Sequence, residues 1–199
     1  MMGLNPNIHT GITDPRIPYY FVNQKQGGAA AQSDPEYRNG DFISIYFGSI
    51  GLNRDHAGRG TFTMMGIYPC GGKYDDGTDA PADGLTTANG TGVAPVRLLT
   101  FADRLYIEAE LIAVGKRTGN ASTVLDNAIN ASFAQVNAVA SAAKLSSQTV
   151  PEVQSGPYRT SVGTEFSAAS DAKKLEIIMT QKWISSFGTS HDQYTDYRR

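Results

Sequence analysis

The sequence predicts a mostly helical fold in which helical hairpins follow a loop-rich region with short strands. Residues 1–95 are rich in Gly, Pro, Asp and Asn, and their apolar residues form only short islands, as is typical of loops. From residue 96 onward, apolar residues recur at the spacing of amphipathic helices. We therefore expect a loop-rich region with short strands over 1–95 and a helical region over 96–199.

The loop-rich region contains few segments that favour regular structure. "FISIYF" (42–47) consists of strand-favouring residues interrupted only by Ser44, which predicts a short strand. The neighbouring segments "SDPEYRNGD" and "KYDDGTDAPADG" contain Pro, Asn-Gly and Asp-Gly. These residues are typical of turns, because Gly accepts a positive φ and Asp caps its own backbone.

The first two predicted helices form a hairpin around the turn "KRTGN" (116–120). The first lies within "VRLLTFADRLYIEAELIAVG" (96–115), with Gly115 as a candidate C-cap. Its apolar face comprises Leu98, Ala102, Leu105, Ala109 and Ile112. The second, over 121–143, has a stripe formed by Leu125, Ala128, Ile129, Ser132, Phe133, Val136 and Ala140. The small residues on this stripe allow close approach of another helix.

A third helix is predicted to begin near Ser170 or Asp171 and to end at Gly188. The side that we expect to be buried carries Leu175, Ile178, Met179, Lys182 and Trp183. Trp183 is therefore predicted to lie in the core. The segment before this helix, 146–166, is predicted to be a polar linker.

Paired helices of this length are the units of tetratricopeptide-type solenoids, in which each hairpin buries one face against its neighbour. The consensus of roughly 34 residues that marks those repeats is not recognisable here. One hairpin and one further helix are also too few to form a stable solenoid alone. We therefore expect the chain to be part of a larger domain.

Charge and hydropathy exclude two classes of function. The 17 Lys and Arg residues nearly balance the 19 Asp and Glu residues, and no predicted helix carries a basic stripe. Nucleic acid is therefore not an expected partner. Apolar runs are much shorter than the roughly 20 residues that span a bilayer. The single cysteine, Cys70, excludes an internal disulfide and a cysteine-based zinc cluster.

The sequence contains no recognisable catalytic motif. His9, His56 and His191 are far apart, and none belongs to a metal-binding or nucleophile motif. "GGKY" and "VGKRTG" do not fit the phosphate-binding loop pattern. We expect a protein that is not an enzyme and that uses no cofactor.

The acidic loop "YDDGTDAPADG" offers oxygen donors from Asp75, Asp76, Asp79 and Asp83, which could hold calcium. It lacks the spacing and the closing Glu of an EF-hand loop. A solvated turn is the preferred interpretation, so no metal site is assigned.

The loop-rich region supplies many aromatic side chains that could stack on the apolar face of a sugar. The alternative is that they fill the core beneath the loops, and we favour this for "YYF" and "YF". Tyr68, Tyr74, His56 and Arg54 lie among Gly-rich loops. These four are the predicted ligand-binding residues.

Several segments together resemble the C-terminal half of the SusD/RagB family of outer-membrane nutrient-binding lipoproteins from Bacteroidetes. The family's helix motif, roughly "LTYAEVLLIKAEA", is similar to residues 98–110, and its "DPRLPYYF" segment is similar to "TDPRIPYYF" (13–21). Its later signature resembles residues 177–199, where Gln181, Lys182, Trp183, Ile184, Phe187, Arg198 and Arg199 coincide with it. Two tryptophans usual in that signature are replaced here by Tyr194 and Tyr197.

The resemblance implies the fold, which is a tetratricopeptide-like α superhelix of the SusD type, and also the class of function. It implies a surface-exposed lipoprotein of the outer membrane that binds a glycan or another nutrient without catalysis. The nutrient would then pass to a TonB-dependent transporter of the SusC type. The lipid anchor and the preceding helices of such a protein are not part of these residues, and we expect the sequence to be a fragment.

A second hypothesis is an interaction scaffold, in which the helical hairpins bind a protein partner and no small ligand. Glycan binding that disappears on Tyr74→Ala or Tyr68→Ala would separate the two hypotheses. The sequence does not identify the ligand, because sugar specificity depends on loop geometry.

Overall fold

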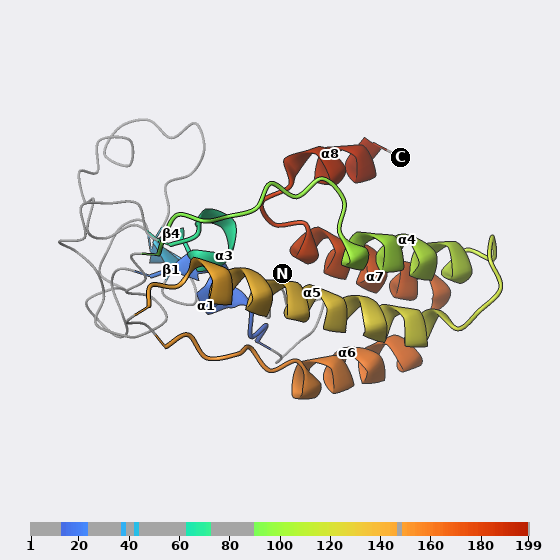
Figure 1. Ribbon diagram of the computed structural model, residues 1–199. Coiled ribbons are helices and arrows are strands. Elements are labelled where there is room, and N and C mark those ends of the chain that lie inside the picture. The colour runs from blue at the N-terminus through green and yellow to red at the C-terminus, as the bar shows by residue number, and fades with distance from the viewer. Residues whose placement is uncertain are drawn as a thin grey trace. The chain divides into compact units, whose positions relative to one another are not determined.

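The computed structural model describes residues 13–23, 37–38, 42–43, 63–72, 90–146 and 149–198. Helices predominate in this part of the chain, and the strands are short (Figure 1), which confirms the mostly helical fold class. The chain divides into two compact units. The helical unit comprises Met1–Arg16, Pro95–Ala138 and Glu152–Arg199, and the second unit comprises Ile17–Ala94 and Val139–Pro151. The predicted division at residue 95 and the larger domain remain predictions.

The second unit contains short elements around a small aromatic core. Its helices are α1 (Ile17–Tyr20) and α3 (Ile67–Cys70). Strand β1 (Phe21–Val22) pairs antiparallel with β4 (Met64–Met65), and β2 (Tyr37–Arg38) pairs antiparallel with β3 (Phe42–Ile43). The strand predicted over 42–47 is thus present as β3, and residues 44–47 lie outside the described part.

A close backbone approach follows α3. Gly71 ends the helix with φ 73°, and its amide donates to the carbonyl of Ile67 at 2.9 Å. The amide of Gly92 donates to the Gly71 carbonyl at 3.1 Å. A Cβ on Gly71 would lie 2.6 Å from both the Gly92 carbonyl carbon and the Val93 nitrogen. The turn therefore needs glycine both for its left-handed conformation and for space.

Helix α4 (Phe101–Ala113) begins at a capping box. Thr100 accepts from the Asp103 amide, and the Asp103 carboxylate accepts from the Thr100 amide. Ala102, Leu105 and Ala109 are buried as predicted. Leu98, which the sequence pattern placed on the same stripe, precedes the helix and is 83% exposed. The capping box therefore starts the helix at Phe101, about one turn later than the hydrophobic period suggests.

Helix α5 (Ala121–Ala143) buries the whole predicted stripe, from Leu125 to Ala140. Asn120 precedes it and accepts the amide protons of Ser122 and Thr123 at 3.0 and 3.2 Å. Helices α4 and α5 run in opposite directions in Figure 1, as a helical hairpin requires.

Helix α6 (Gly156–Ala168) lies where a polar linker was predicted, so that prediction was wrong. Tyr158, Val162 and Phe166, spaced by four residues, form its buried face. Gly156 and Gly163 lower the helix propensity of the segment, whereas Pro157 lies in the first turn, where proline is tolerated. Tertiary packing of the three buried side chains outweighs that propensity, because burial of large apolar groups contributes several kcal/mol, at about 25 cal/mol per Å².

Helix α7 (Asp171–Ser185) starts as predicted, because the Ser170 hydroxyl caps it by accepting from the Lys173 amide. It packs against α4, and α6 also contacts it. Of the predicted face, Ile178 and Lys182 are buried and Leu175 and Met179 are half-buried. The buried face also includes Ile177, Gln181 and Ile184, which were not predicted. Trp183 points away from this face and is 46% exposed, which contradicts its predicted place in the core. Helix α8 (Ser190–Arg198) follows.

Candidate functional site

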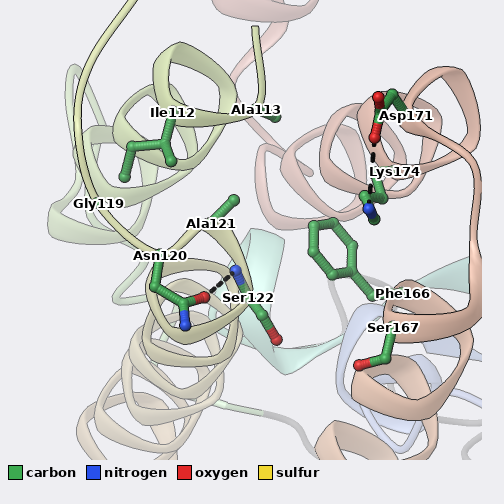
Figure 2. Close-up of a pocket in the computed structure, with 10 residues that line it drawn as sticks. All are labelled: Ile112, Ala113, Gly119, Asn120, Ala121, Ser122, Phe166, Ser167, Asp171 and Lys174. Carbon is green, nitrogen blue, oxygen red and sulfur yellow. Dashed lines mark hydrogen bonds and ion pairs between the residues drawn. The ribbon is translucent and has the colours of Figure 1, made fainter. Parts of the chain in front are cut away.

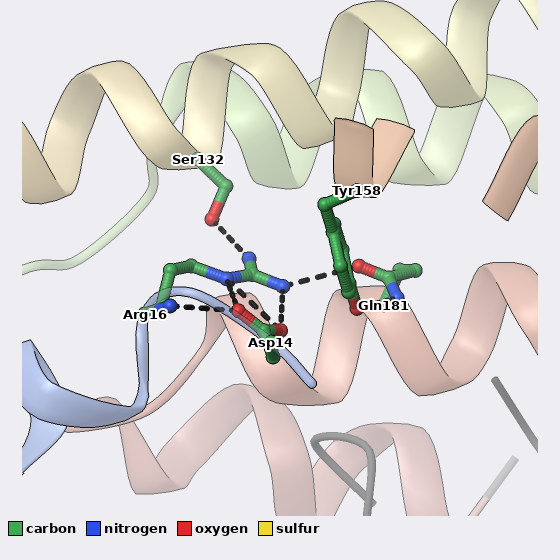
Figure 3. A network of polar contacts seen from close by, with 5 residues as sticks. All are labelled: Asp14, Arg16, Ser132, Tyr158 and Gln181. Atoms are coloured by element: carbon green, nitrogen blue, oxygen red, sulfur yellow. Dashed lines mark hydrogen bonds and ion pairs between the residues drawn. The ribbon is translucent and has the colours of Figure 1, made fainter. Parts of the chain in front are cut away.

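The helical unit is held together by a buried charge pair (Figure 3). Asp14 and Arg16 have no exposed side-chain surface, and Nη2 of Arg16 lies 2.6 Å from Oδ2 of Asp14. Nε of Arg16 also donates to Oδ1 of Asp14 at 3.0 Å. The backbone amide of Arg16 donates to the same oxygen at 2.9 Å. The carboxylate is thus held by several donors that compensate for its burial.

The remaining Arg16 donors reach helices far away in the sequence. Nη1 donates to Ser132 Oγ on α5 at 2.8 Å, and Nη2 donates to Gln181 Oε1 on α7 at 3.2 Å. The Gln181 amide donates to the Tyr158 hydroxyl on α6 at 2.7 Å. The guanidinium carbon lies 4.7 Å from the centroid of the Phe133 ring. One side chain therefore fixes the 13–16 segment against α5 and α7, and through Gln181 to α6.

Two tyrosine hydroxyls near this network are buried. Burial raises the pKa of Tyr106 and of Tyr158 well above the ordinary value of 10.0. Above pH 10 the unfolded chain loses these protons while the folded protein keeps them. Their contribution to stability is therefore complete below pH 10 and is lost as the pH rises further.

We expect the free energy of unfolding to be insensitive to these two groups from pH 7 to 9. Above pH 10 it should fall by about 1.4 kcal/mol per pH unit for each tyrosine. Urea unfolding at several pH values would measure this slope. Tyr158→Phe should reduce it, because it removes one of the two buried hydroxyls. An unchanged slope in Tyr158→Phe would contradict the assignment.

A pocket of about 540 Å³ lies in the helical unit where α4 and α6 end and α5 and α7 begin (Figure 2). Its volume is in the range of roughly 300–1,000 Å³ that is usual for ligand sites. The apolar part of its lining comprises Ile112, Ala113, Gly119, Ala121 and Phe166. The polar part comprises Asn120, Ser122, Ser167, Asp171 and Lys174.

The polar groups of this pocket, which we call the end pocket, belong to short local interactions. Nζ of Lys174 lies 3.3 Å from Oδ1 of Asp171, one helical turn away. Ser167 Oγ donates to the Gly163 carbonyl at 2.8 Å. Figure 2 shows Asn120 and Ser122 on one side of the opening and Phe166 and Lys174 on the other. The pocket thus offers an apolar surface together with donors and acceptors from three helices and a cap.

The predicted ligand-binding residues are only partly described. Tyr68 lies in α3, is 1% exposed, and stacks on Tyr20 with ring centroids 4.9 Å apart. Its ring is thus part of the core of the second unit. Arg54, His56 and Tyr74 lie outside the described residues, as do Asp75, Asp76, Asp79 and Asp83. Only Tyr68 of the four is therefore placed, and the role of the four in binding stays a prediction.

Sequence reasoning did not single out the end pocket or the Arg16 network. The network has one signal in the sequence, since Asp14 and Arg16 belong to the "DPR" segment that carried the family resemblance. The end pocket has no such signal, because small residues such as Ala113 and Ala121 look like ordinary helix positions.

In the described ranges, no group of three or more His, Cys, Asp or Glu residues could hold a metal ion. No helix in those ranges is long and apolar enough to span a bilayer.

Comparison with known proteins gives one positive result. A family model for SusD-like proteins, described as starch-binding and associating with the outer membrane, matches residues 6–199. No curated protein and no solved structure matches the chain. The match includes the "DPR" segment and every described helix, and the tetratricopeptide-like helical fold of the family agrees with the structure. The chain therefore belongs to the SusD-like family of non-catalytic, starch-binding proteins associated with the outer membrane.

Proposed function

We propose that the protein captures a glycan at the cell surface and delivers it unchanged to a TonB-dependent outer-membrane transporter of the SusC type. In this proposal it is a surface-exposed lipoprotein of the outer membrane, attached there by a lipid anchor. The observation that carries the proposal is the family match over nearly the whole chain. The end pocket supports it, because its size and mixed lining suit a small polar ligand with an apolar face.

The ligand contacts in this proposal are Arg54, His56 and Tyr74, with Tyr68 as the fourth predicted residue. Arginine and histidine supply hydrogen-bond donors for sugar hydroxyls, and tyrosine supplies a ring face. Tyr68 is buried, so Tyr68→Ala should also lower stability. Tyr74→Ala is therefore the cleaner test of ligand contact.

The experiment is calorimetric titration of the protein with malto-oligosaccharides, followed by chromatography of the sugar after long incubation. We expect saturable binding and an unchanged sugar. Tyr74→Ala should weaken binding about fivefold, which corresponds to about 1 kcal/mol. Tyr194→Ala is the matched control, because Tyr194 is an exposed tyrosine on α8. Absence of binding to any glycan, or release of shorter sugars, would contradict the proposal.

One observation favours the interaction scaffold as a second candidate. Ile107, Leu111 and the C-cap residue Val114 lie on one side of α4 at i, i+4 and i+7 spacing and are all exposed, although α4 buries its opposite side. Such a stripe fits an amphipathic helix of a protein partner. A scaffold should bind a hydrophobic dye, lose that signal in Ile107→Ser and Leu111→Ser, and show no saccharide binding.

A further inference from the structure

We propose that the end pocket is a binding site for a neutral saccharide unit. This rests on the proposed function, because it assigns to that function a site formed by the ends of α4 to α7. The described residues that line it are 112–113, 119–122, 166–167, 171 and 174, and Tyr68 is not among them. A sugar ring needs an apolar surface for its C–H face and donors and acceptors for its hydroxyls, and the end pocket offers both.

The polar groups of the pocket suit hydroxyls. The ammonium group of Lys174 donates and the carboxylate of Asp171 accepts, and these atoms lie 3.3 Å apart at the same opening. Two adjacent hydroxyls of a sugar could accept from the first and donate to the second. Asp171 is almost fully exposed and Lys174 is one-third exposed, so both can turn toward a ligand. The Asn120 amide nitrogen is a further donor, because only the Asn120 oxygen is used as a cap.

The charges of the lining favour a neutral ligand over an acidic one. Among the described residues that line it, Lys174 is the only cation and Asp171 the only anion, and each lies beside the other. Two helices also begin here, which would favour an anion if their first amides were free. Asn120 occupies the amides of Ser122 and Thr123, and Ser170 occupies that of Lys173. These caps engage part of the first-turn donors of both helices, which weakens the preference of the helix ends for an anion.

The test uses a second ion pair on the same helix as a matched control. Lys173 pairs with Glu176 at 3.1 Å, is about as exposed as Lys174, and does not line the pocket. Binding of maltoheptaose to Lys174→Met, Asp171→Asn and Lys173→Met would be measured by calorimetry, with thermal unfolding of each variant as a check of folding. Ala113→Phe, which places a ring in the pocket without removing a polar group, is an independent variant.

We expect Lys174→Met to weaken binding about tenfold, since it removes a charged hydrogen-bond donor to a sugar hydroxyl. Asp171→Asn should weaken binding less than Lys174→Met does. Ala113→Phe should abolish binding of maltoheptaose to the end pocket. Lys173→Met should leave it unchanged, and an acidic oligogalacturonide should bind more weakly than maltoheptaose. Wild-type binding that all the pocket variants retain would overturn this proposal and leave the proposed function standing. Absence of wild-type binding to every glycan would overturn both.

Discussion

Replacing Arg16 with methionine is expected to lower the free energy of unfolding by about 3–5 kcal/mol. The substitution leaves the Asp14 carboxylate buried without its ion-pair partner. It also removes the donors to Ser132 on α5 and Gln181 on α7. Breaking a buried pair costs more than its net contribution, because the remaining charge cannot be solvated. Unfolding in urea, followed by circular dichroism, measures the change.

An exposed pair provides the control for the Arg16 experiment. Arg104 is half exposed and pairs with Glu108 at 3.0 Å, so Arg104→Met should cost less than about 1 kcal/mol. The double variant Asp14→Leu/Arg16→Met should be more stable than Arg16→Met alone, because it removes both buried charges. A small effect of Arg16→Met, similar to that of Arg104→Met, would show that the network does not hold the helical unit together.

Gly71→Ala is expected to destabilise the protein by about 2–4 kcal/mol. A left-handed conformation costs an alanine about 1–2 kcal/mol. Its Cβ would also lie 2.6 Å from backbone atoms of Gly92 and Val93, and such overpacking costs about 1–3 kcal/mol. Backbone atoms cannot move aside as the end of a flexible side chain can. Thermal or urea unfolding would show the loss.

Substitution of Gly115 separates the conformational cost from the steric cost. It has the same φ of 73° as Gly71, but a Cβ there would meet nothing within 4 Å. Gly115→Ala should therefore show only the conformational cost of about 1–2 kcal/mol. If Gly71→Ala and Gly115→Ala cost the same, the close approach at Gly71 does not matter for stability.

The helices that could be predicted from sequence are those with a continuous apolar period. In α5 every predicted stripe residue is buried, because the helix packs on that side alone and its period is uninterrupted. Helix α6 was missed because Gly156, Pro157 and Gly163 look like loop residues. Its signal was the spacing of Tyr158, Val162 and Phe166, which is visible only when the Gly and Pro residues are discounted.

The buried face of α7 was predicted only in part, for a different reason. The helix carries Gln181, Lys182 and Ser185 among its buried residues, so hydropathy does not mark its buried side. Gln181 is buried because Arg16 and Tyr158 satisfy its amide, and Lys182 is buried beside Asp196 at 2.7 Å. Such pairings depend on residues distant in sequence, and a local pattern cannot contain them.

The candidate site could be predicted even less well than the fold. The end pocket forms where four helices begin or end, and its lining residues belong to no recognisable sequence motif. By contrast, the class of function could be predicted from the segments that resemble the SusD/RagB family. One of these segments contains Asp14 and Arg16. The role of that pair in the structure is to position helices.

The Arg16 network also bears on the order in which the chain folds during synthesis. Arg16 is separated by 116 residues from Ser132 and by 165 residues from Gln181. The ribosome therefore releases Arg16 long before its last partner exists, whereas Asp14 and the backbone hydrogen bonds within α4 and α5 are local and available at once. The contact of Arg16 with α7 cannot form until residue 181 has emerged. A pause in translation before that point would leave a nascent chain with the Asp14–Arg16 pair formed but without its contact to α7.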